Sequence, residues 1–287
     1  MKIRKAIIPA AGFGTRFLPA TKSQPKEMLS VIDKPLILFS VEEAVQSGIE
    51  SIAIITSRGK STMEDFFDIS PELERFLEEK GKLDLLEEVK RISGLAEFCF
   101  IRQKQALGLG HAVLMGEKFI GQEPFAVLLP DDIYDSETPC TKQLIDAYDE
   151  YQASTIVLGR TDEEGTRMYG IVKPRQVTEK VFQIEDLVEK PGPEKAFSDL
   201  ASLGRYVFTP EIFEGIKKTK PDHKGEMQLP DGIKYLLDKP SVYGVLFEGD
   251  RYDCGDKMGF LEATISLALK RPEFGPKLKD FLKSLNL

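Results

Sequence analysis

A short glycine-rich segment near the N-terminus carries the residues whose chemistry is easiest to interpret. Residues 10–16 read AAGFGTR and directly follow an apolar run at residues 6–9. Glycine lets a ligand approach the backbone closely, and amide N–H groups gathered in such a turn form an anion-binding concavity. Arg16 and Lys26 add two cations beside this turn. We therefore interpret the segment as a loop that holds a triphosphate.

Two better-known phosphate-binding loops do not match this segment. A dinucleotide fingerprint reads G-x-G-x-x-G and continues into a helix, but Phe17 stands in place of its third glycine. A P-loop needs G-x-x-x-x-G-K-[ST], and the chain contains no such run. For Gly12 and Gly14 alone, an ordinary glycine-rich turn is the alternative. Arg16 and the segment 25–27 (PKE) weigh against that alternative.

Two acidic segments that follow predicted strands are candidates for a metal site. Residues 128–132 read LLPDD, which places Asp131 at the end of a buried strand. Mg²⁺ prefers one or two carboxylates together with substrate phosphates and water, so Asp131 is expected to bind it. Capping of the following loop is the alternative role. Asp253 offers a second carboxylate, and a role in the turn before Gly255 fits it equally well.

Further segments offer groups for a base or a sugar. Gly108 opens a predicted helix, and Gln103 carries the amide donor and acceptor that match the edge of a pyrimidine. A loop with a surface glutamine is the alternative. Glu189 and Lys190 end a strand: a carboxylate suits sugar hydroxyls and an ammonium suits a phosphate, although two solvated charges would look the same. Two small residues beside tyrosines would suit a sugar ring lying against the backbone, namely Gly170 and Gly204.

Composition limits the classes of partner. The chain has 287 residues, a net charge of −8 and no long Lys/Arg tract, which argues against nucleic acid and anionic membrane surfaces as partners. It has no apolar run near the ~20 residues that span a bilayer, and no signal peptide precedes the first strand. Three widely spaced cysteines fit a reducing compartment, so we expect a cytoplasmic protein. Two histidines make a histidine-based catalytic centre improbable.

The elements that must position these residues alternate between strand and helix. This alternation predicts an α/β fold, a parallel sheet with helices on both faces. Strands are expected at 5–9, 52–56, 98–101, 125–129, 155–158, 170–172, 182–188, 203–208 and 243–247. Helices are expected at 36–48, up to 67, 71–91 with a break at Gly81, 111–120, 141–151, 210–217, 226–237, 258–269 and 276–285. No linker is visible, so we expect one continuous domain.

Taken together, the ordered segments resemble one family. They read PAAGFGTRFLPATKSQPKEML, IDKPLI, GLGHAV, LLPDD, YGIV, VEKP, GRYVFTPEIF, GEMQL and YDCGDKMGF. From about residue 3 to 270 this set resembles the bacterial UTP–glucose-1-phosphate uridylyltransferases, also called UDP-glucose pyrophosphorylases. KEML, GLGHAV and GEMQL favour this branch of the sugar nucleotidyltransferases over the thymidylyl and adenylyl branches. Pro230-Asp231-Gly232 departs from the Thr-Asp-Ala expected in many members.

The resemblance implies a fold and a division of the chain. The expected fold is a Rossmann-like three-layer α/β/α nucleotidyltransferase fold, with a mostly parallel mixed central sheet and C-terminal helices. The single domain, residues 1–287, would have a nucleotide-binding half at about 1–160, a sugar-binding half at about 161–255 and C-terminal helices at about 256–287. A homodimer or homotetramer is also implied, and the terminal helices are candidate contact surfaces.

The resemblance further implies a reaction in which UTP and α-D-glucose 1-phosphate give UDP-glucose and pyrophosphate, with Mg²⁺ as cofactor. It implies these roles: Ala10, Ala11, Gly12 and Gly14 hold the nucleotide, Glu27, Gln103 and Gly108 line the uridine site, Arg16 and Lys26 neutralise the triphosphate, Asp131 and Asp253 bind Mg²⁺, Gly170, Glu189 and Gly204 hold glucose, and Lys190 holds its phosphate. No side-chain nucleophile is needed, because the sugar phosphate itself attacks. Catalysis would then be mostly positioning and charge neutralisation.

Two alternatives are kept open. The first is the same chemistry with dTTP or another hexose 1-phosphate. The second is a nucleotide-sugar sensor without activity, whose signature would be the loss of the cations and the carboxylate at positions 16, 26 and 131; all three are present.

Overall fold

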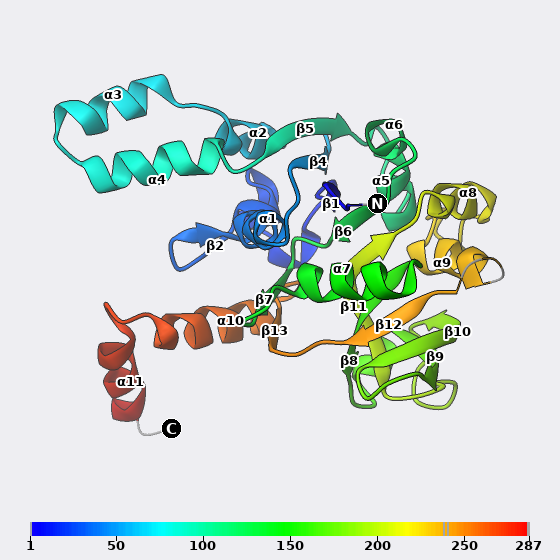
Figure 1. Ribbon diagram of the computed structural model, residues 1–287. Helices are drawn as coiled ribbons and strands as arrows, with labels where there is room; N and C mark the ends of the chain where they lie inside the picture. The colour runs from blue at the N-terminus through cyan, green and yellow to red at the C-terminus, as the bar shows by residue number, and fades with distance from the viewer. Residues whose placement is uncertain (1, 238, 240, 286–287) are drawn as a thin grey trace.

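A computed structural model describes residues 2–237, 239 and 241–285 of the chain. Nine of the described strands form one sheet in the order β5-β4-β1-β6-β11-β8-β12-β10-β9 (Figure 1). Their bounds in chain order are β1 Lys5–Pro9, β4 Ser51–Thr56, β5 Glu97–Arg102, β6 Phe125–Leu128, β8 Thr155–Arg160, β9 Gly170–Gln176, β10 Val181–Glu189, β11 Leu200–Phe208 and β12 Tyr243–Leu246. The strands expected from the sequence are therefore all present.

The sheet is mixed, with most strands pointing the same way. β5, β4, β1 and β6 pair in parallel, and β12 pairs in parallel with β8. β11 runs antiparallel to both β6 and β8, and β10 runs antiparallel to β12 and β9. Only β10 and β11 among these nine strands therefore run against the rest. The prediction of a mostly parallel mixed sheet is confirmed.

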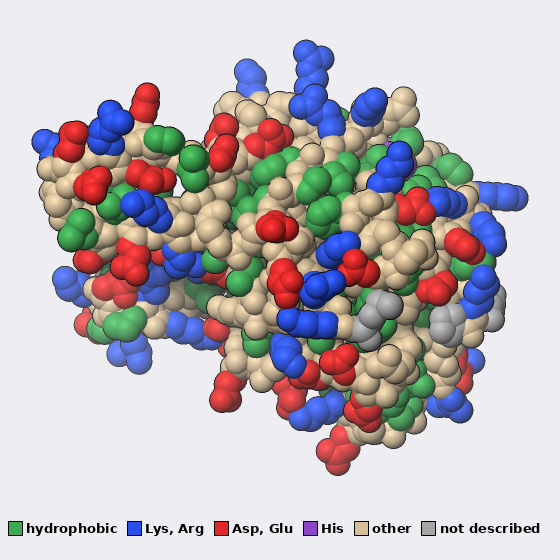
Figure 2. Space-filling view, turned by 45° about the horizontal axis from the view of Figure 1, so that its top comes forward, with side chains coloured by type: hydrophobic (Ala, Val, Ile, Leu, Met, Phe, Trp, Pro, Cys, Tyr) green, Lys and Arg blue, Asp and Glu red, His purple; other side chains and the backbone are tan. Residues whose placement is uncertain are grey.

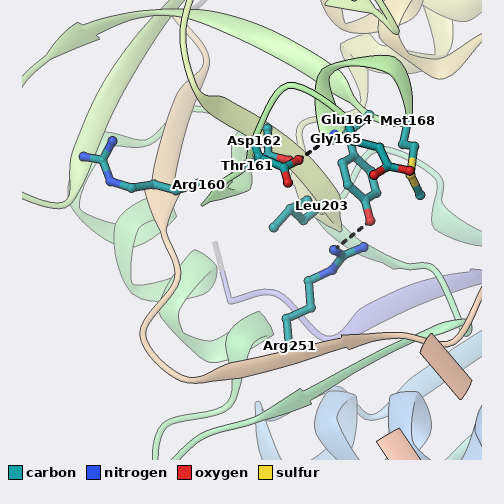
Figure 3. Close-up of a pocket in the computed structure, with 9 residues that line it drawn as sticks. Arg160, Thr161, Asp162, Glu164, Gly165, Met168, Leu203 and Arg251 are labelled. Atoms are coloured by element: carbon teal, nitrogen blue, oxygen red, sulfur yellow. Dashed lines mark hydrogen bonds between the residues drawn. The ribbon is translucent and has the colours of Figure 1, made fainter. Parts of the chain in front are cut away.

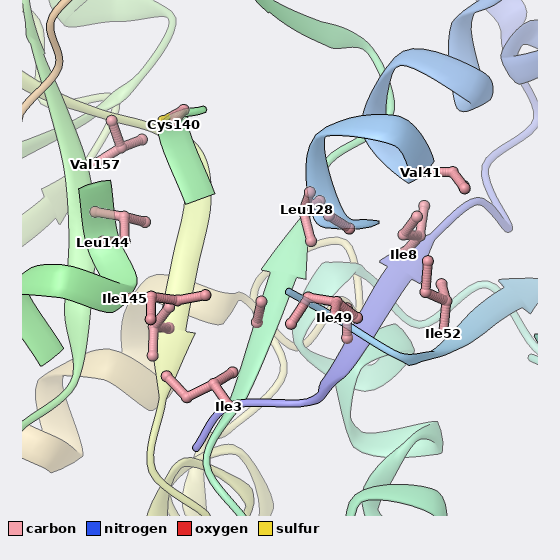
Figure 4. Packing of buried hydrophobic residues seen from close by; sticks show 14 of the residues in the cluster. Ile3, Ile8, Val41, Ile49, Ile52, Leu128, Cys140, Leu144, Ile145 and Val157 are labelled. Atoms are coloured by element: carbon pink, nitrogen blue, oxygen red, sulfur yellow. The ribbon is translucent and has the colours of Figure 1, made fainter. Parts of the chain in front are cut away.

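Helices cover both faces because the strands are apolar on both sides, as expected for parallel strands. One face packs on α1 Leu36–Gln46, α2 Ser61–Phe67 and α7 Cys140–Tyr151. The other packs on α5 Leu109–Met115, α6 Glu117–Ile120, α8 Glu211–Lys218 and α9 Leu229–Leu237. In β1, Ile8 joins the first core and Ile7 the second, as the alternation of side chains along a strand requires. Figure 4 shows Ile8 and Ile52 facing Val41 of α1.

Smaller elements complete the described chain. β2 Ser30–Val31 pairs with β3 Lys34–Pro35, and β7 Asp132–Asp135 pairs with β13 Asp250–Asp253. A helical hairpin of α3 Pro71–Glu79 and α4 Leu83–Ser93 projects from the body, as the charge-rich sequence with a break at Gly81 predicted (Figure 1). α10 Lys257–Lys270 and α11 Gly275–Ser284 also extend away from the body, at the lower left of Figure 1.

Two details differ from the sequence-based expectation. The single helix expected at 111–120 is two helices, α5 and α6, which meet at Gly116. A Cβ at Gly116 would lie 2.9 Å from Cγ1 of Ile7, so the chain approaches β1 closely there. The antiparallel pairing of β7 with β13 was not expected, because four-residue strands with charged side chains lack the apolar pattern that predicts a strand.

Charge and hydropathy are distributed without a large basic field in the view of Figure 2. Lys and Arg side chains are interspersed with Asp and Glu across that face. None of the described helices is both long enough and apolar enough to cross a membrane.

Candidate active site

The predicted nucleotide residues gather at the carboxyl ends of parallel strands, where open α/β sheets bind ligands. The glycine loop follows β1, Gln103 follows β5, and Asp131 follows β6. These segments border a cavity of about 380 Å³, here called the nucleotide cavity. Its lining includes seven of the predicted nucleotide-side residues and one predicted metal ligand: Ala11, Gly12, Gly14, Lys26, Glu27, Gln103, Gly108 and Asp131.

Hydrogen bonds from neighbouring segments hold the backbone of the glycine loop. Gly14 has a φ of +63°, a conformation that glycine adopts without strain, and the hydroxyl of Thr21 donates to its carbonyl at 2.8 Å. Ala10 lies beneath the cavity rather than in its lining. Its N–H donates to the carbonyl of Ile55 at 2.8 Å, and its own carbonyl accepts from Nζ of Lys60 at 2.6 Å. Ala10 therefore anchors the loop, while Ala11 and Gly12 face the cavity.

Glu27 is held by a lysine that the sequence analysis did not identify. Nζ of Lys60 lies 2.9 Å from Oε2 of Glu27, and both side chains are buried. Oε1 of Glu27 has no hydrogen-bond partner among the described residues, and the residue lines the nucleotide cavity. Burial raises the pKa of Glu27 against the pull of Lys60, and burial lowers the pKa of Lys60. A carboxylate oxygen in this position needs a donor from a ligand or water.

Gln103 is oriented by its neighbours. Its Nε2 contacts Nδ1 of His111 at 2.8 Å and donates to the carbonyl of Gly108 at 3.2 Å. His111 therefore has a local hydrogen-bonding role at the start of α5. Burial lowers the pKa of His111, which favours the neutral ring that accepts from the amide. The amide oxygen of Gln103 is left to face a ligand.

The predicted sugar-side residues surround a second cavity of about 310 Å³, here called the sugar cavity. Gly170 begins β9, Glu189 ends β10, and Gly204 lies in β11. Lys190 has a φ of +49° and its Nζ lies 3.3 Å from the Glu189 carboxylate. The chain turns at this acid–base pair, and both residues line the same cavity.

Gly204 is glycine for a steric reason. The pairing of β11 with β8 shifts register between Ser202 and Tyr206, which indicates a bulge, and Gly204 has a φ of +83° within it. A Cβ at this position would lie 2.5 Å from Oδ2 of Asp132. The bulge therefore brings the backbone of β11 close to the acidic turn after β6.

Asp131 lies where the two cavities meet, because it lines both of them. Its Oδ2 is 2.5 Å from Nζ of Lys26. Burial alone would raise the pKa of Asp131, but the Lys26 ammonium holds it below its usual value. Burial likewise opposes the charge on Lys26, and Asp131 and Glu27 raise its pKa on balance. The pair is therefore ionised and faces the space between the cavities.

Asp253 is brought beside Asp131 by the antiparallel pairing of β7 with β13. A Cβ on Gly255 would lie 2.8 Å from Oδ1 of Asp253, 3.5 Å from Oδ2 of Asp131 and 3.6 Å from Nη1 of Arg16. Only glycine leaves this cradle open. Within the described residues, no group of three His, Cys, Asp or Glu side chains forms a metal centre by itself. A hard cation here would need phosphate and water oxygens in addition, which matches the preference of Mg²⁺.

The two carboxylates differ in how far the chain already engages them. Oδ1 of Asp253 accepts from the N–H of Gly255 at 2.9 Å, and its Oδ2 accepts from the hydroxyl of Tyr169 at 2.5 Å and from Arg251 at 3.2 Å. The turn role considered for Asp253 is therefore real. Arg251 also pairs with Asp132. Burial raises the pKa of Asp132 to about 7, against the opposing charge of Arg251.

Arg251 was also missed by the sequence analysis, and it separates the sugar cavity from an outer one. The outer cavity, about 580 Å³ in volume, is shown in Figure 3, where Arg251 and Leu203 are among the residues that line it. It shares four residues with the sugar cavity: Met168, Tyr169, Leu203 and Arg251. The outer cavity contains none of the predicted site residues.

The departure at residues 230–232 lies beside the sugar cavity. Pro230 lines that cavity at the start of α9, where a proline fits the first turn of a helix. Gly232 is buried against α8, and a Cβ there would lie 2.8 Å from Cγ1 of Ile216. The glycine therefore allows a close crossing of the two helices.

Comparisons with known proteins agree with this geometry. A nucleotidyl transferase family model matches residues 5–269. The chain is 51% identical over 284 residues to a Bacillus subtilis protein named UTP–glucose-1-phosphate uridylyltransferase, covering 99% of this chain and 97% of that protein. A solved structure of UDP-glucose pyrophosphorylase with UDP-glucose matches with a TM-score of 0.86 and 42% identity, covering 94% of this chain and all of that one.

A UTP-bound structure of the same enzyme from Acinetobacter baumannii matches with a TM-score of 0.92 and 38% identity, covering 99% of this chain and all of that one. The resemblance to the bacterial UTP–glucose-1-phosphate uridylyltransferases is thereby confirmed, as is the nucleotidyltransferase fold. The chain belongs to the nucleotidyl transferase family.

Proposed function

We propose that this enzyme transfers a uridylyl group from UTP to α-D-glucose 1-phosphate, releasing pyrophosphate and forming UDP-glucose. One observation carries the proposal: the nucleotide and sugar cavities meet at Asp131 and share Leu109, Leu129 and Glu226. A reaction that joins two phosphorylated substrates needs one point at which both phosphates stand. Lys26 lines the nucleotide cavity, whereas Lys190 and also Arg16, which was expected on the nucleotide side, line the sugar cavity.

The bond changes require no group from the chain. A phosphate oxygen of glucose 1-phosphate forms a bond to the α-phosphorus of UTP, and the bond from that phosphorus to the β-phosphate oxygen breaks. Pyrophosphate leaves with that electron pair. The work of the chain is to hold two polyanions in line, and orientation of this kind supplies up to roughly 7–11 kcal/mol in favourable systems.

Each side of the site offers groups for one part of this task. Ala11 and Gly12 line the nucleotide cavity, where their backbone N–H groups would donate to the triphosphate, and Gln103 and Glu27 would offer acceptors to donors on the uridine. On the other side, Glu189 offers acceptors to sugar hydroxyls, and Lys190 offers an ammonium to the sugar phosphate.

We propose Asp131 and Asp253 as the residues that hold Mg²⁺. When bound, the ion supplies positive charge at the phosphate oxygens. Asp131 is the stronger donor of the two, because the oxygens of Asp253 already accept hydrogen bonds from Gly255, Tyr169 and Arg251. A cation on Oδ2 of Asp131 competes with Lys26 for that oxygen, so Lys26 would turn to a phosphate.

The test is a grid of nucleoside triphosphates against hexose 1-phosphates, with pyrophosphate release as the readout and Mg²⁺ present. UTP with glucose 1-phosphate should give the highest turnover. Equal or better turnover with dTTP would remove the UTP assignment, and a better hexose would remove the glucose assignment. No release with any pair, from protein that still binds UDP-glucose, would favour the non-catalytic sensor.

We also propose a homodimer or homotetramer. Four apolar side chains on α10 are exposed at helical spacing, Met258, Leu261, Ile265 and Leu269, and exposed apolar stripes of this kind mark contact surfaces. Light scattering after gel filtration should report at least twice the 32.2 kDa chain mass. A monomer would contradict this part. The free cysteines fit the cytoplasm as the compartment.

A further inference from the structure

Arg205 stands next to Gly204 in sequence but does not reach the sugar cavity. Its side chain is fully buried, and its guanidinium points toward the turn that follows β6. Nη1 donates to the carbonyl of Leu129 at 2.6 Å, and Nη2 donates to the carbonyl of Asp132 at 2.8 Å. These carbonyls stand on either side of Asp131, so one side chain grips both ends of the acidic turn.

The backbone of the Leu129–Asp132 turn makes three other hydrogen bonds, while Lys26 and Arg251 contact the carboxylates of Asp131 and Asp132. The N–H of Asp132 donates to the carbonyl of Leu129 at 3.4 Å, and the carbonyl of Asp131 accepts from the N–H of Cys254 at 2.8 Å. The N–H of Leu129 donates to the carbonyl of Gly204 at 3.0 Å. Arg205 supplies the shortest of the contacts to the backbone of the turn, and it comes from the strand that also carries the sugar-side Gly204.

The guanidinium is itself anchored on the far side. Its Nε and Nη2 donate to the carboxylate of Glu43 in α1, with distances of 2.9–3.2 Å. Glu43 is buried and also accepts from the N–H and hydroxyl of Thr141 in α7. The ring of Tyr134 lies 4.6 Å from the guanidinium carbon. A planar fork held on one edge by a carboxylate is well suited to hold two carbonyls on the other.

We propose that Arg205 is a positioning residue of the transfer reaction: it fixes the Leu129–Asp132 turn and thereby sets where Asp131 stands between the two cavities. The inference rests on the proposed role of Asp131. Arg205 is not among the residues that line either cavity, so it would touch neither substrate nor metal. It would act only through the backbone of the turn. Neither the sequence analysis nor the comparisons assign it a role.

The experiment must separate positioning from stability. Replacing a buried ion pair by apolar residues is often neutral or stabilising, whereas removing one partner is not. The main variant is therefore Arg205→Met combined with Glu43→Leu, which removes the grip on both carbonyls without leaving a lone buried charge. Ser40→Ala is the matched control, because it removes a 3.3 Å contact to the same guanidinium and leaves the carbonyl contacts intact.

The double variant should still fold, with a urea midpoint lowered only by the lost partners of Thr141 and of the two carbonyls. The kcat of the remaining folded protein should fall by about 10²-fold, the loss expected for a displacement of about 1 Å at a reacting group. Mn²⁺ binding without substrates, followed by electron paramagnetic resonance, should weaken by about tenfold. The KM for UTP should change little, because the glycine loop does not depend on Arg205. Ser40→Ala should match the wild type in all four measurements.

Three results would overturn the proposal. These are a folded double variant whose kcat and Mn²⁺ affinity stay within about threefold of wild type, a loss of turnover that only follows the loss of folded protein, and a Ser40→Ala variant as impaired as the double variant. If the double variant does not fold, Arg205→Lys decides: an intact fold with reduced kcat supports the role, and wild-type kcat or a second failure to fold rejects it.

The proposed function can fail separately. If the wild type releases no pyrophosphate from UTP and glucose 1-phosphate, the reaction assignment is wrong. The Mn²⁺ titration then still shows whether Arg205 sets the acidic turn.

Discussion

Two ion pairs meet the acidic turn after β6 from opposite sides, and they are built differently. Arg205 and Glu43 are both buried, and every edge of the guanidinium is engaged. Lys26 and Asp131 form a single 2.5 Å contact, with 21% and 26% of the side chains exposed. Both members of the first pair are also hydrogen-bonded to the surrounding chain, Arg205 to the carbonyls of Leu129 and Asp132 and Glu43 to Thr141. The second faces both cavities, where phosphates and a cation would compete for its members.

This difference separates a fixed support from an exchangeable contact. Removing one member of a buried pair leaves an uncompensated charge and destabilises the fold strongly. Removing one member of a partly exposed pair costs little stability, but here it would remove a group that we propose contacts substrate or metal. Removing one member of the buried pair should therefore lower mainly stability, and removing one member of the partly exposed pair should lower mainly turnover.

Glu43→Ala should have the largest effect. Arg205 would remain buried without its carboxylate, so the free energy of unfolding should fall by about 3–5 kcal/mol. Urea denaturation followed by circular dichroism measures this. A loss below about 1 kcal/mol would show that the buried pair is not the support described here.

Lys26→Ala should keep the fold and lower turnover by at least about 10²-fold, the loss expected when one transition-state charge partner is removed. Because Lys26 competes with a cation for Asp131, Mn²⁺ binding to the substrate-free variant should tighten rather than weaken. Steady-state pyrophosphate release and the Mn²⁺ titration test the two halves. Near-normal turnover would remove Lys26 from the reaction.

Lys60→Met tests a pair that lies between the two extremes. Lys60 and Glu27 are buried, yet Oε1 of Glu27 faces the nucleotide cavity. Without Lys60, the Glu27 carboxyl becomes neutral more readily and the carbonyl of Ala10 loses its donor. The KM for UTP should rise by about tenfold, with a smaller change for glucose 1-phosphate, since one lost hydrogen bond to a charged group is worth about 1.5–3 kcal/mol. Equal changes in both constants would count against this arrangement.

His111 should produce the smallest effect, through pH. Burial lowers its folded-state pKa below 6.5. As the pH falls from 6.5 towards the lower folded-state pKa, the unfolded chain binds the proton first. The contribution of neutral His111 to stability is therefore lost on acidification. The protonated ring also cannot accept from Gln103. The KM for UTP should rise a few-fold between pH 7 and 5.5, and His111→Asn should flatten the difference. Identical profiles for both proteins would exclude this role.

Sequence patterns predict the groups that line the two cavities better than the groups that support them. Gly12, Gln103 and Asp131 follow three apolar strands, β1, β5 and β6. Because these strands are parallel, their carboxyl ends lie at one edge of the sheet, and the convergence of the three residues was predictable. Glu43 falls on the apolar stripe of its helix, which signals burial but names no partner. Arg205 lies 162 positions away, and no spacing rule links the two.

Other supports were hidden for related reasons. The paired strands β7 and β13 are four residues long and carry charged side chains. Their pairing places Arg251 within reach of Asp132 and Asp253. The bulge at Gly204 depends on how β11 registers against two neighbours at once. Such features arise from packing of distant segments, and local sequence patterns do not encode them.

A crystal structure of the chain with UDP-glucose and Mg²⁺ would test the central claim most directly. We expect the uridine beside Gln103 in the nucleotide cavity, the glucose beside Glu189 in the sugar cavity, and the diphosphate next to Asp131, with the contacts of Arg205 unchanged. A nucleotide bound away from residues 10–16, or a diphosphate remote from Asp131, would contradict the account.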